Sequence, residues 1–231
     1  MDWINRLTVF SNWDLSAVGL ILVCYVFIGL LIENASVSHP SVSQLMAEHR
    51  RSWMRHMAAR DVRIFDAQVL NGLRQGTAFF ASTTMLATGG VLALIGNADK
   101  LIDVADDLSL NPASDWVWEM KLLLTLLLVT NAFLKFVWSH RLFGYCAILM
   151  AAVPNEPEDP QSLAMSRKAG EVNITAARSY NRGLRAIYFS IASIAWLVGP
   201  WALMAATIIT VGVLLRREFM SKSRAVLLDK D

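Results

Sequence analysis

The sequence is poor in charged residues and in cysteine, and both shortages restrict the class of protein. Asp, Glu, Lys and Arg make up 17% of the 231 residues, against about 25% in soluble chains, while hydrophobic residues make up 55%. The two cysteines, Cys24 and Cys146, are too few for a disulfide framework and have no CxxC neighbour, so we expect both to be packed as small hydrophobic residues. The composition predicts an integral membrane protein.

The sequence also lacks the common motifs of catalysis and ligand binding. It contains no GxSxG, P-loop or GxGxxG pattern. The four histidines, His39, His49, His56 and His140, do not have the i, i+3 or i, i+4 spacing of a helical metal site. With a net charge of only +2, the chain also lacks the strong positive charge typical of nucleic-acid binding. We therefore expect no cofactor, no metal and no nucleic-acid partner, and find no specific support for an enzyme.

Long apolar runs predict four transmembrane helices, at about residues 15–32, 76–96, 116–138 and 186–215. Each is long enough for a hydrocarbon core of about 30 Å. The fourth run would form a helix of roughly 45 Å, and Gly199-Pro200 stands at its middle. We interpret it as one kinked span; the alternative is a hairpin that folds back at Gly199-Pro200.

Two further segments, about 41–75 and 142–185, predict helices outside the membrane. Ser41 and Gln44 have capping-box spacing, so a helix should begin there. From Val42 onward apolar residues recur at helical spacing between arginines, and no proline interrupts the pattern before Gly96. We therefore expect one continuous helix from the capping box through the second span.

The segment 142–185 is expected to contain two helical parts. Its apolar stretch 142–153 is too short to span a membrane and should continue the third transmembrane helix. A loop with Pro154, Pro157 and Pro160 follows, and then a helix over about 162–185. The predicted architecture is all-α: a single membrane domain of four transmembrane helices with a cytoplasmic amphipathic helix layer.

Lysine and arginine are distributed unevenly among the connections. Segments 35–75 and 139–185 carry six each, whereas segment 97–115 carries one, together with five Asp. The positive-inside rule places the two Arg-rich segments in the cytoplasm and the acidic connection outside. Four spans would then put both termini outside. The C-terminal tail conflicts with this placement, because it carries five Lys or Arg.

Short motifs are distributed along nearly the whole chain. They are Arg50-x-x-Trp53, Arg60-Asp61-x-Arg63-x-x-Asp66, Phe79-Phe80-Ala81-Ser82-Thr83, Gly89-Gly90, Glu119-x-Lys121, Phe133-x-Lys135-Phe136-x-Trp138-Ser139-x-Arg141, Asn181-x-Gly183-x-Arg185-x-x-Tyr188-Phe189 and Arg217-Glu218-Phe219-x-Ser221. In this order the motifs resemble an uncharacterised bacterial membrane protein family with plant relatives, the domain of unknown function 599. The resemblance implies a four-helix membrane protein, which we expect in a bacterial inner membrane. The positive-inside rule then predicts a periplasmic N-terminus. It implies no activity.

The candidate site is a cluster of mainly basic residues at the cytoplasmic boundary. Guanidinium groups bind phosphate and carboxylate bidentately and can hold such groups at membrane depth. The alternative is ordinary positive-inside charge. The candidate anion or lipid-headgroup residues are Arg60, Arg63, Asp66, Arg74, Arg141, Asn181, Arg182 and Arg185.

Three functions are compatible with these features. The favoured one is a non-enzymatic accessory, scaffold or lipid-contacting membrane protein with an Arg-rich cytoplasmic face. Its expected partners are the lipid bilayer, including anionic lipid, and a membrane protein or second copy of the chain. The alternative is a small transporter or channel for an anionic or neutral solute, with a polar path that includes Thr125, Thr130 and Asn131. The third is a membrane enzyme acting on a lipid headgroup.

Overall fold

All regular structure in the described part of the chain is helical. The computed structural model describes residues 9–97, 115–156 and 158–229, so the predicted acidic connection 97–115 lies outside it apart from its two ends. The helices are α2 (Asn12–Glu33), α3 (Val42–Ala58), α4 (Ile64–Ile95), α6 (Asp115–Ala151), α7 (Pro160–Ile194), the short 3-10 helix η1 (Ala195–Leu197), α8 (Pro200–Phe219) and α9 (Lys222–Leu228). The all-α prediction is confirmed.

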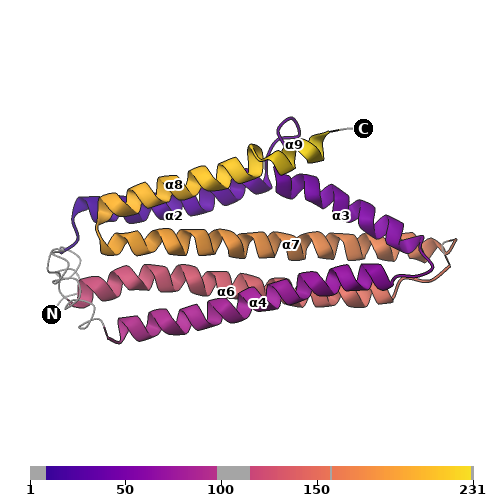
Figure 1. The fold of residues 1–231 in the computed structure, drawn as a ribbon, viewed down its shortest axis with the longest axis horizontal. Helices are drawn as coiled ribbons and strands as arrows, with labels where there is room; N and C mark the ends of the chain where they lie inside the picture. The colour runs from indigo at the N-terminus through magenta and orange to yellow at the C-terminus, as the bar shows by residue number, and fades with distance from the viewer. Residues whose placement is uncertain (1–8, 98–114, 157, 230–231) are drawn as a thin grey trace.

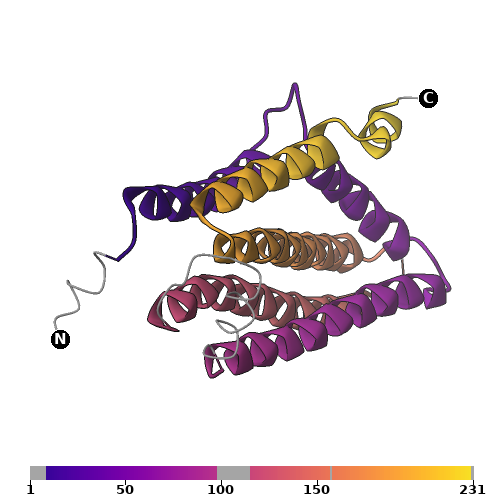
Figure 2. The ribbon, with the colours of Figure 1, turned by 60° about the vertical axis from the view of Figure 1, so that its left-hand side comes forward.

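The three longest helices, α4, α6 and α7, lie side by side with α6 in the middle (Figure 1). Helices α2 and α8 pack on each other and cover one half of α7, and α3 covers the other half. Figure 2 shows the same order from a second direction, with α3 and α4 diverging on opposite sides of α7. We call the half beyond the end of α2, comprising residues 42–75 and 139–179, the extension.

Three helices, α2, α4 and α6, are long and apolar enough to cross a membrane. They contain the predicted runs 15–32, 76–96 and 116–138. The outer face of α4 is strongly exposed: Leu86 is 78% and Phe79 is 66% accessible, as expected of side chains that face lipid. Helix α6 runs without a break to Ala151, which confirms that the stretch after residue 142 continues the third helix.

The predicted single kinked span over 186–215 is wrong. Helix α7 ends at Ile194, η1 follows, and α8 then runs back beside α2 (Figure 1). The reversal occurs at Gly199, whose φ of 152° and ψ of 172° fall in a region that is essentially restricted to glycine. Pro200 starts α8, where its missing N–H costs nothing. The fold-back alternative therefore describes this segment.

The predicted continuous helix from residue 41 to Gly96 is also wrong, because the chain turns between Ala58 and Ile64. Arg63 stabilises this turn from the side. Its Nη1 donates to the carbonyl of Val153 and its Nη2 to that of Pro154, both at 2.7 Å. These acceptors lie 90 residues further along the chain, so the break depends on tertiary contacts rather than on local turn residues.

The helices enclose a separate buried core at each end of the molecule. One lies between α2, α6, α7 and α8 and includes Ile28, Phe189 and Leu203. The other lies in the extension and includes Met57 and Phe143. Polar contacts between the helices lie between these two cores, where α2 ends and α3 begins, and they position the site described next.

Candidate functional site

The site lies where α2 ends and α3 begins, at the base of the extension. Ser41 caps α3 in the predicted capping box with Gln44, which confirms that prediction. The Ser41 hydroxyl also donates to the carbonyl of Ile32 at 2.9 Å, and Gln44 Nε2 donates to the carbonyl of Ala35 at 2.9 Å. The loop between the two helices is thus tied at both sides, which fixes the direction in which α3 leaves.

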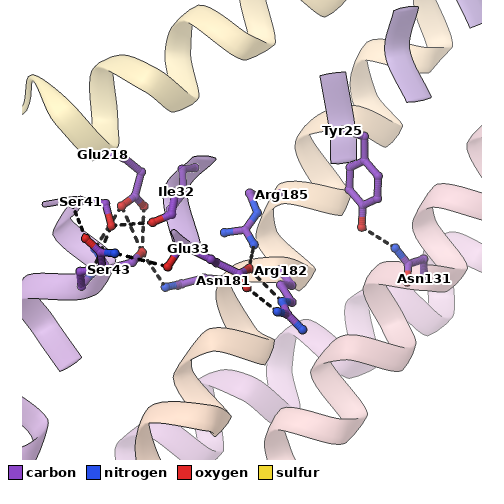
Figure 3. A network of polar contacts seen from close by, with 11 residues as sticks. Tyr25, Ile32, Glu33, Ser41, Ser43, Asn131, Asn181, Arg182, Arg185 and Glu218 are labelled. Carbon is purple, nitrogen blue, oxygen red and sulfur yellow. Dashed lines mark hydrogen bonds and ion pairs between the residues drawn. The ribbon is translucent and has the colours of Figure 1, made fainter. Parts of the chain in front are cut away.

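A carboxylate at the end of α2 joins this helix to α7. Glu33 forms ion pairs with Arg182 and Arg185, one turn apart on α7 (Figure 3). Arg182 Nε donates to Glu33 Oε1 at 2.9 Å. The side chains of Glu33 and Arg185 are 16% and 8% exposed, so the charges neutralise each other away from bulk water. Both arginines therefore have an anionic partner within the protein, although the single carboxylate balances only one of their two positive charges.

A second carboxylate joins α8 to α3. Glu218 accepts hydrogen bonds from the backbone N–H of Ser43 at 3.1 Å and from the Ser43 hydroxyl (Figure 3). An acidic group at the first turn of a helix is favoured by the helix dipole. Asn181 Nδ2 donates to the same hydroxyl at 3.3 Å, and Arg224 Nε donates to the carbonyl of Pro40 at 2.9 Å. The C-terminal segment therefore closes onto the loop between α2 and α3.

These contacts surround a cavity of about 500 Å³, which we call the junction cavity. Helices α2, α3, α4, α6, α7 and α8 and the start of α9 contribute to its wall. Its polar lining residues are Glu33, Ser43, Gln44, Arg50, Thr77, Arg178, Tyr180, Asn181, Arg185, Arg217, Glu218, Ser221 and Ser223, and its apolar ones include Ile32, Val42, Met46, Leu73, Phe143 and Ile174. The volume is within the range of small-molecule sites, and the lining combines apolar walls with a few polar groups.

Arg50 is the most unusual of the lining side chains. Its Nη1 donates to Oδ1 of Asn173, a fully buried residue whose amide contacts Cys146 Sγ at 3.5 Å. Burial lowers the pKa of the Arg50 guanidinium. Within the described residues no carboxylate forms an ion pair with Arg50. The Arg50 side chain is half-buried, and a partly desolvated cation with only a neutral partner is energetically costly unless an anion joins it.

The structure places three of the predicted cluster residues at the turn between α3 and α4. Asp66 is fully buried, pairs with Arg60 and accepts from Trp53 Nε1 at 2.7 Å. Arg63 binds the backbone carbonyls at the end of α6. This group stabilises the turn, and its members do not line the junction cavity.

Two more predicted residues, Arg74 and Arg141, lie on α4 and α6. Arg141 stacks on Tyr145, with the guanidinium 5.6 Å from the ring centroid. The Arg74 Nε atom is buried without a hydrogen-bond partner among the described residues, and the Arg74 carbonyl lies 3.3 Å from Nδ1 of His140. Neither arginine contributes to the junction cavity.

The eight predicted residues thus fall into three groups, and the structure brings together only Asn181, Arg182 and Arg185 at the junction. Of these, Asn181 and Arg185 line the cavity. Sequence reasoning missed Ser43, Arg50, Arg178, Arg217 and Glu218 as site residues. Arg50 and the Arg217-Glu218 pair belong to the family motifs described above, and this was the one sequence feature that could have identified them as site residues.

Comparison with known proteins agrees with this reading of the motifs. Residues 16–223 match a family described as "Protein of unknown function, DUF599". No curated protein and no solved structure matches the chain. The match covers both arms of the α7–α8 hairpin and every residue of the junction cavity. The chain belongs to the DUF599 family of proteins of unknown function.

Proposed function

We propose that this protein is a non-enzymatic multi-pass membrane protein that holds a membrane-derived amphiphile in the junction cavity. The observation that carries the proposal is the position of the cavity, between an apolar helix bundle and an Arg-rich extension. Its wall joins the ends of α2 and α8 to the sides of α3, α4 and α7. A ligand there would have its apolar part against Leu73 and Phe143 and its polar part against the arginines.

The hairpin at Gly199 supports a cytoplasmic position for the extension. Helix α8 has 20 residues, about 30 Å of helix, so it is long enough to return across a bilayer beside α2. The basic tail then lies at the same side as the Arg-rich helices, and the conflict with the positive-inside rule disappears. The first turn of α2 lies at the opposite end of the bundle from the extension (Figure 1). In this arrangement the protein would sit in a bacterial inner membrane with its N-terminus in the periplasm.

The residues around the cavity favour binding over catalysis. Both carboxylates in its wall are engaged, Glu33 by two arginines and Glu218 by Ser43. No histidine or cysteine of the described residues contributes to the wall. The Ser43 hydroxyl does donate to Glu218, but this carboxylate also accepts from the Ser43 backbone N–H, so the pair joins α8 to the first turn of α3.

The transporter alternative receives less support from the polar residues of the bundle. Thr125 forms a 2.8 Å hydrogen bond with Ser193, and Asn131 Nδ2 donates to the Tyr25 hydroxyl at 2.6 Å (Figure 3). Both bonds join neighbouring helices. Their polar atoms therefore contribute to helix packing and are not free to line a path for solute.

A cavity-filling substitution tests the proposal. Gly76 lines the junction cavity, and a Cβ added there meets no atom within 4 Å, so Gly76→Phe should fill the space without breaking α4. Gly89→Phe is the matched control, because Gly89 stands on the same helix, is equally open and does not line the cavity. Each variant is purified in mild detergent, and the bound small molecules are counted by native mass spectrometry.

We expect Gly76→Phe to lose a molecule that the wild type and Gly89→Phe retain. If the ligand content is the same in all three proteins, the junction cavity is not the binding site and the proposal is wrong. Circular dichroism and the elution volume of each variant show that the helix bundle has formed.

A further inference from the structure

We infer that the ligand of the junction cavity carries an acidic oxyanion, a phosphate or a carboxylate, that is bound by Arg50. The inference rests on the proposed function and adds the chemical class of the ligand. It starts from the charges in the cavity wall, where four arginines face two glutamates. Glu33 is paired with Arg185, and Glu218 binds the neutral Ser43, so the four guanidiniums and two carboxylates leave the wall with a net charge of +2.

Arg50 differs from Arg51 and Arg185 in having no anionic partner among the described residues. Arg51, the next residue, pairs with Glu171 on α7 and with Glu48 one turn away. Arg185 pairs with Glu33. Arg50 instead donates to the neutral amide of Asn173, although a guanidinium has five N–H donors. The arrangement fits a guanidinium whose remaining donors are kept for an external acceptor.

The Arg50 side chain is also held in place. Asn173 is fully buried, and its Nδ2 contacts Cys146 Sγ. The amide oxygen that accepts from Arg50 is therefore held in one orientation. Ordering an arginine in advance reduces the conformational entropy that ligand binding would otherwise cost. A preorganised, poorly solvated guanidinium is a strong site for a carboxylate or phosphate, which it contacts through parallel hydrogen bonds.

Two more arginines face the same cavity and add to its positive potential. Arg178 on α7 and Arg217 on α8 form no ion pair within the described residues, and Arg217 Nη1 donates only to the Tyr188 hydroxyl at 3.2 Å. The wall also contains Leu73 and Phe143, which suit an aliphatic chain. An acid with an attached apolar chain matches both parts of the lining. Such an acid can be an anionic membrane lipid, or its acidic group alone can come from solution.

The test compares Arg50→Gln with Arg51→Gln, a matched control on the same helix whose side chain lies outside the cavity. Each full-length protein is reconstituted into vesicles of equal phosphatidylglycerol and phosphatidylcholine and extracted again in mild non-ionic detergent. Mass spectrometry then counts the lipids retained per protein. In a second arm, inorganic phosphate is added to the delipidated proteins and the shift in the thermal midpoint is measured.

For the wild type and Arg51→Gln we expect retention of phosphatidylglycerol over phosphatidylcholine by about tenfold, the factor of a charge-assisted hydrogen bond. Arg50→Gln should retain the two lipids equally. The ligand is a soluble anion instead if phosphate raises the thermal midpoint of the wild type but not that of Arg50→Gln, while the wild type shows no preference between the two lipids. If Arg50→Gln does not fold, Arg178→Gln, at an exposed position on α7, should reduce the same preference.

The inference is overturned if wild type and Arg50→Gln retain the same lipids and respond equally to phosphate. That result can be separated from a failure of the proposed function. A neutral ligand that is lost in Gly76→Phe but kept in Arg50→Gln would refute the acidic class and leave the cavity as a binding site. A ligand kept in Gly76→Phe would refute the cavity itself.

Discussion

The closest approach between α6 and α7 gives the sharpest test of the packing. A Cβ built on Gly183 would lie 2.8 and 2.9 Å from two ring carbons of Phe136, well inside van der Waals contact. The Phe136 ring cannot easily move, because it is fully buried, stacked on Phe80 at 5.3 Å and in edge contact with Tyr180 at 5.4 Å. Gly183→Ala should therefore introduce a clash of a kind that costs about 1–3 kcal/mol in a packed core.

Gly144→Ala provides the matched control. Gly144 lies within α6, and a Cβ there meets nothing within 4 Å. Both substitutions gain the same helix propensity, about 1 kcal/mol, so the difference between the two variants isolates the clash. At about 2–4 °C per kcal/mol for a chain of this size, Gly183→Ala should melt at least about 2 °C below Gly144→Ala in the same detergent.

The assay is the thermal midpoint followed by tryptophan fluorescence and checked by size-exclusion chromatography. Shortening the ring should relieve the contact, so Phe136→Leu combined with Gly183→Ala should be more stable than the sum of the two single effects predicts. Equal midpoints for Gly183→Ala and Gly144→Ala would show that α6 and α7 are not packed as closely as described.

Three further predictions follow from the hairpin and the extension. Gly199→Ala should destabilise the protein by about 1–3 kcal/mol, measured as a lower thermal midpoint, because alanine does not readily adopt its φ of 152°. In a cysteine-free background, Ser223→Cys should react with a membrane-impermeant thiol reagent from the cytoplasmic side only, and Asn12→Cys from the other side only; labelling of both from one side would refute the hairpin. The hydrogen bond from Arg51 lowers the pKa of Glu171 in the folded protein. This exposed pair therefore adds less than about 1 kcal/mol to the free energy of unfolding at a pH above the unfolded pKa of 4.5. The contribution is lost as the pH falls through the lower pKa of the folded state. The midpoints of wild type and Glu171→Gln should therefore converge in acid; a gap that persists would contradict this.

The sequence predicted those features of the fold that depend on local signals. The capping box at Ser41 places the start of α3 because both hydrogen bonds are made within four residues. The apolar runs locate α2, α4 and α6 because hydrophobicity and length suffice to identify a helix of membrane thickness.

The two reversals escaped prediction for different physical reasons. The turn before Ile64 contains no Pro or Gly, and it is stabilised by Arg63, whose acceptors Val153 and Pro154 are far away in sequence. Gly199-Pro200 marks the hairpin in the sequence, but the apolar arm before it, 186–198, is shorter than the roughly 20 residues that cross a bilayer. That arm is the end of the 35-residue α7, whose polar residues conceal its length.

The candidate site could be predicted only in its general chemistry. The excess of arginine at one boundary is plain from the sequence, but neutralisation by a carboxylate depends on tertiary pairing. Glu33 reaches Arg182 and Arg185 across 149 and 152 residues, and no local pattern indicates that choice. Arg50 lacks such a partner and Arg51 has two, but the sequence of these adjacent arginines does not indicate which of them is paired.

The hairpin and the junction cavity are physically one feature. If the chain continued straight at Gly199, α8 would carry Arg217 and Glu218 about 30 Å away from the turn, on the far side of the apolar bundle from α3. Glu218 could then not bind the first turn of α3 at Ser43, and the cavity would lose the wall formed by the C-terminal segment. The conformation of a single glycine is therefore linked to the occupancy of a site at the other end of α8. For this reason Gly199→Ala should reduce ligand retention as well as stability, whereas a substitution that only weakens the bundle, such as Gly183→Ala, should lower the thermal midpoint and leave retention in the folded protein unchanged.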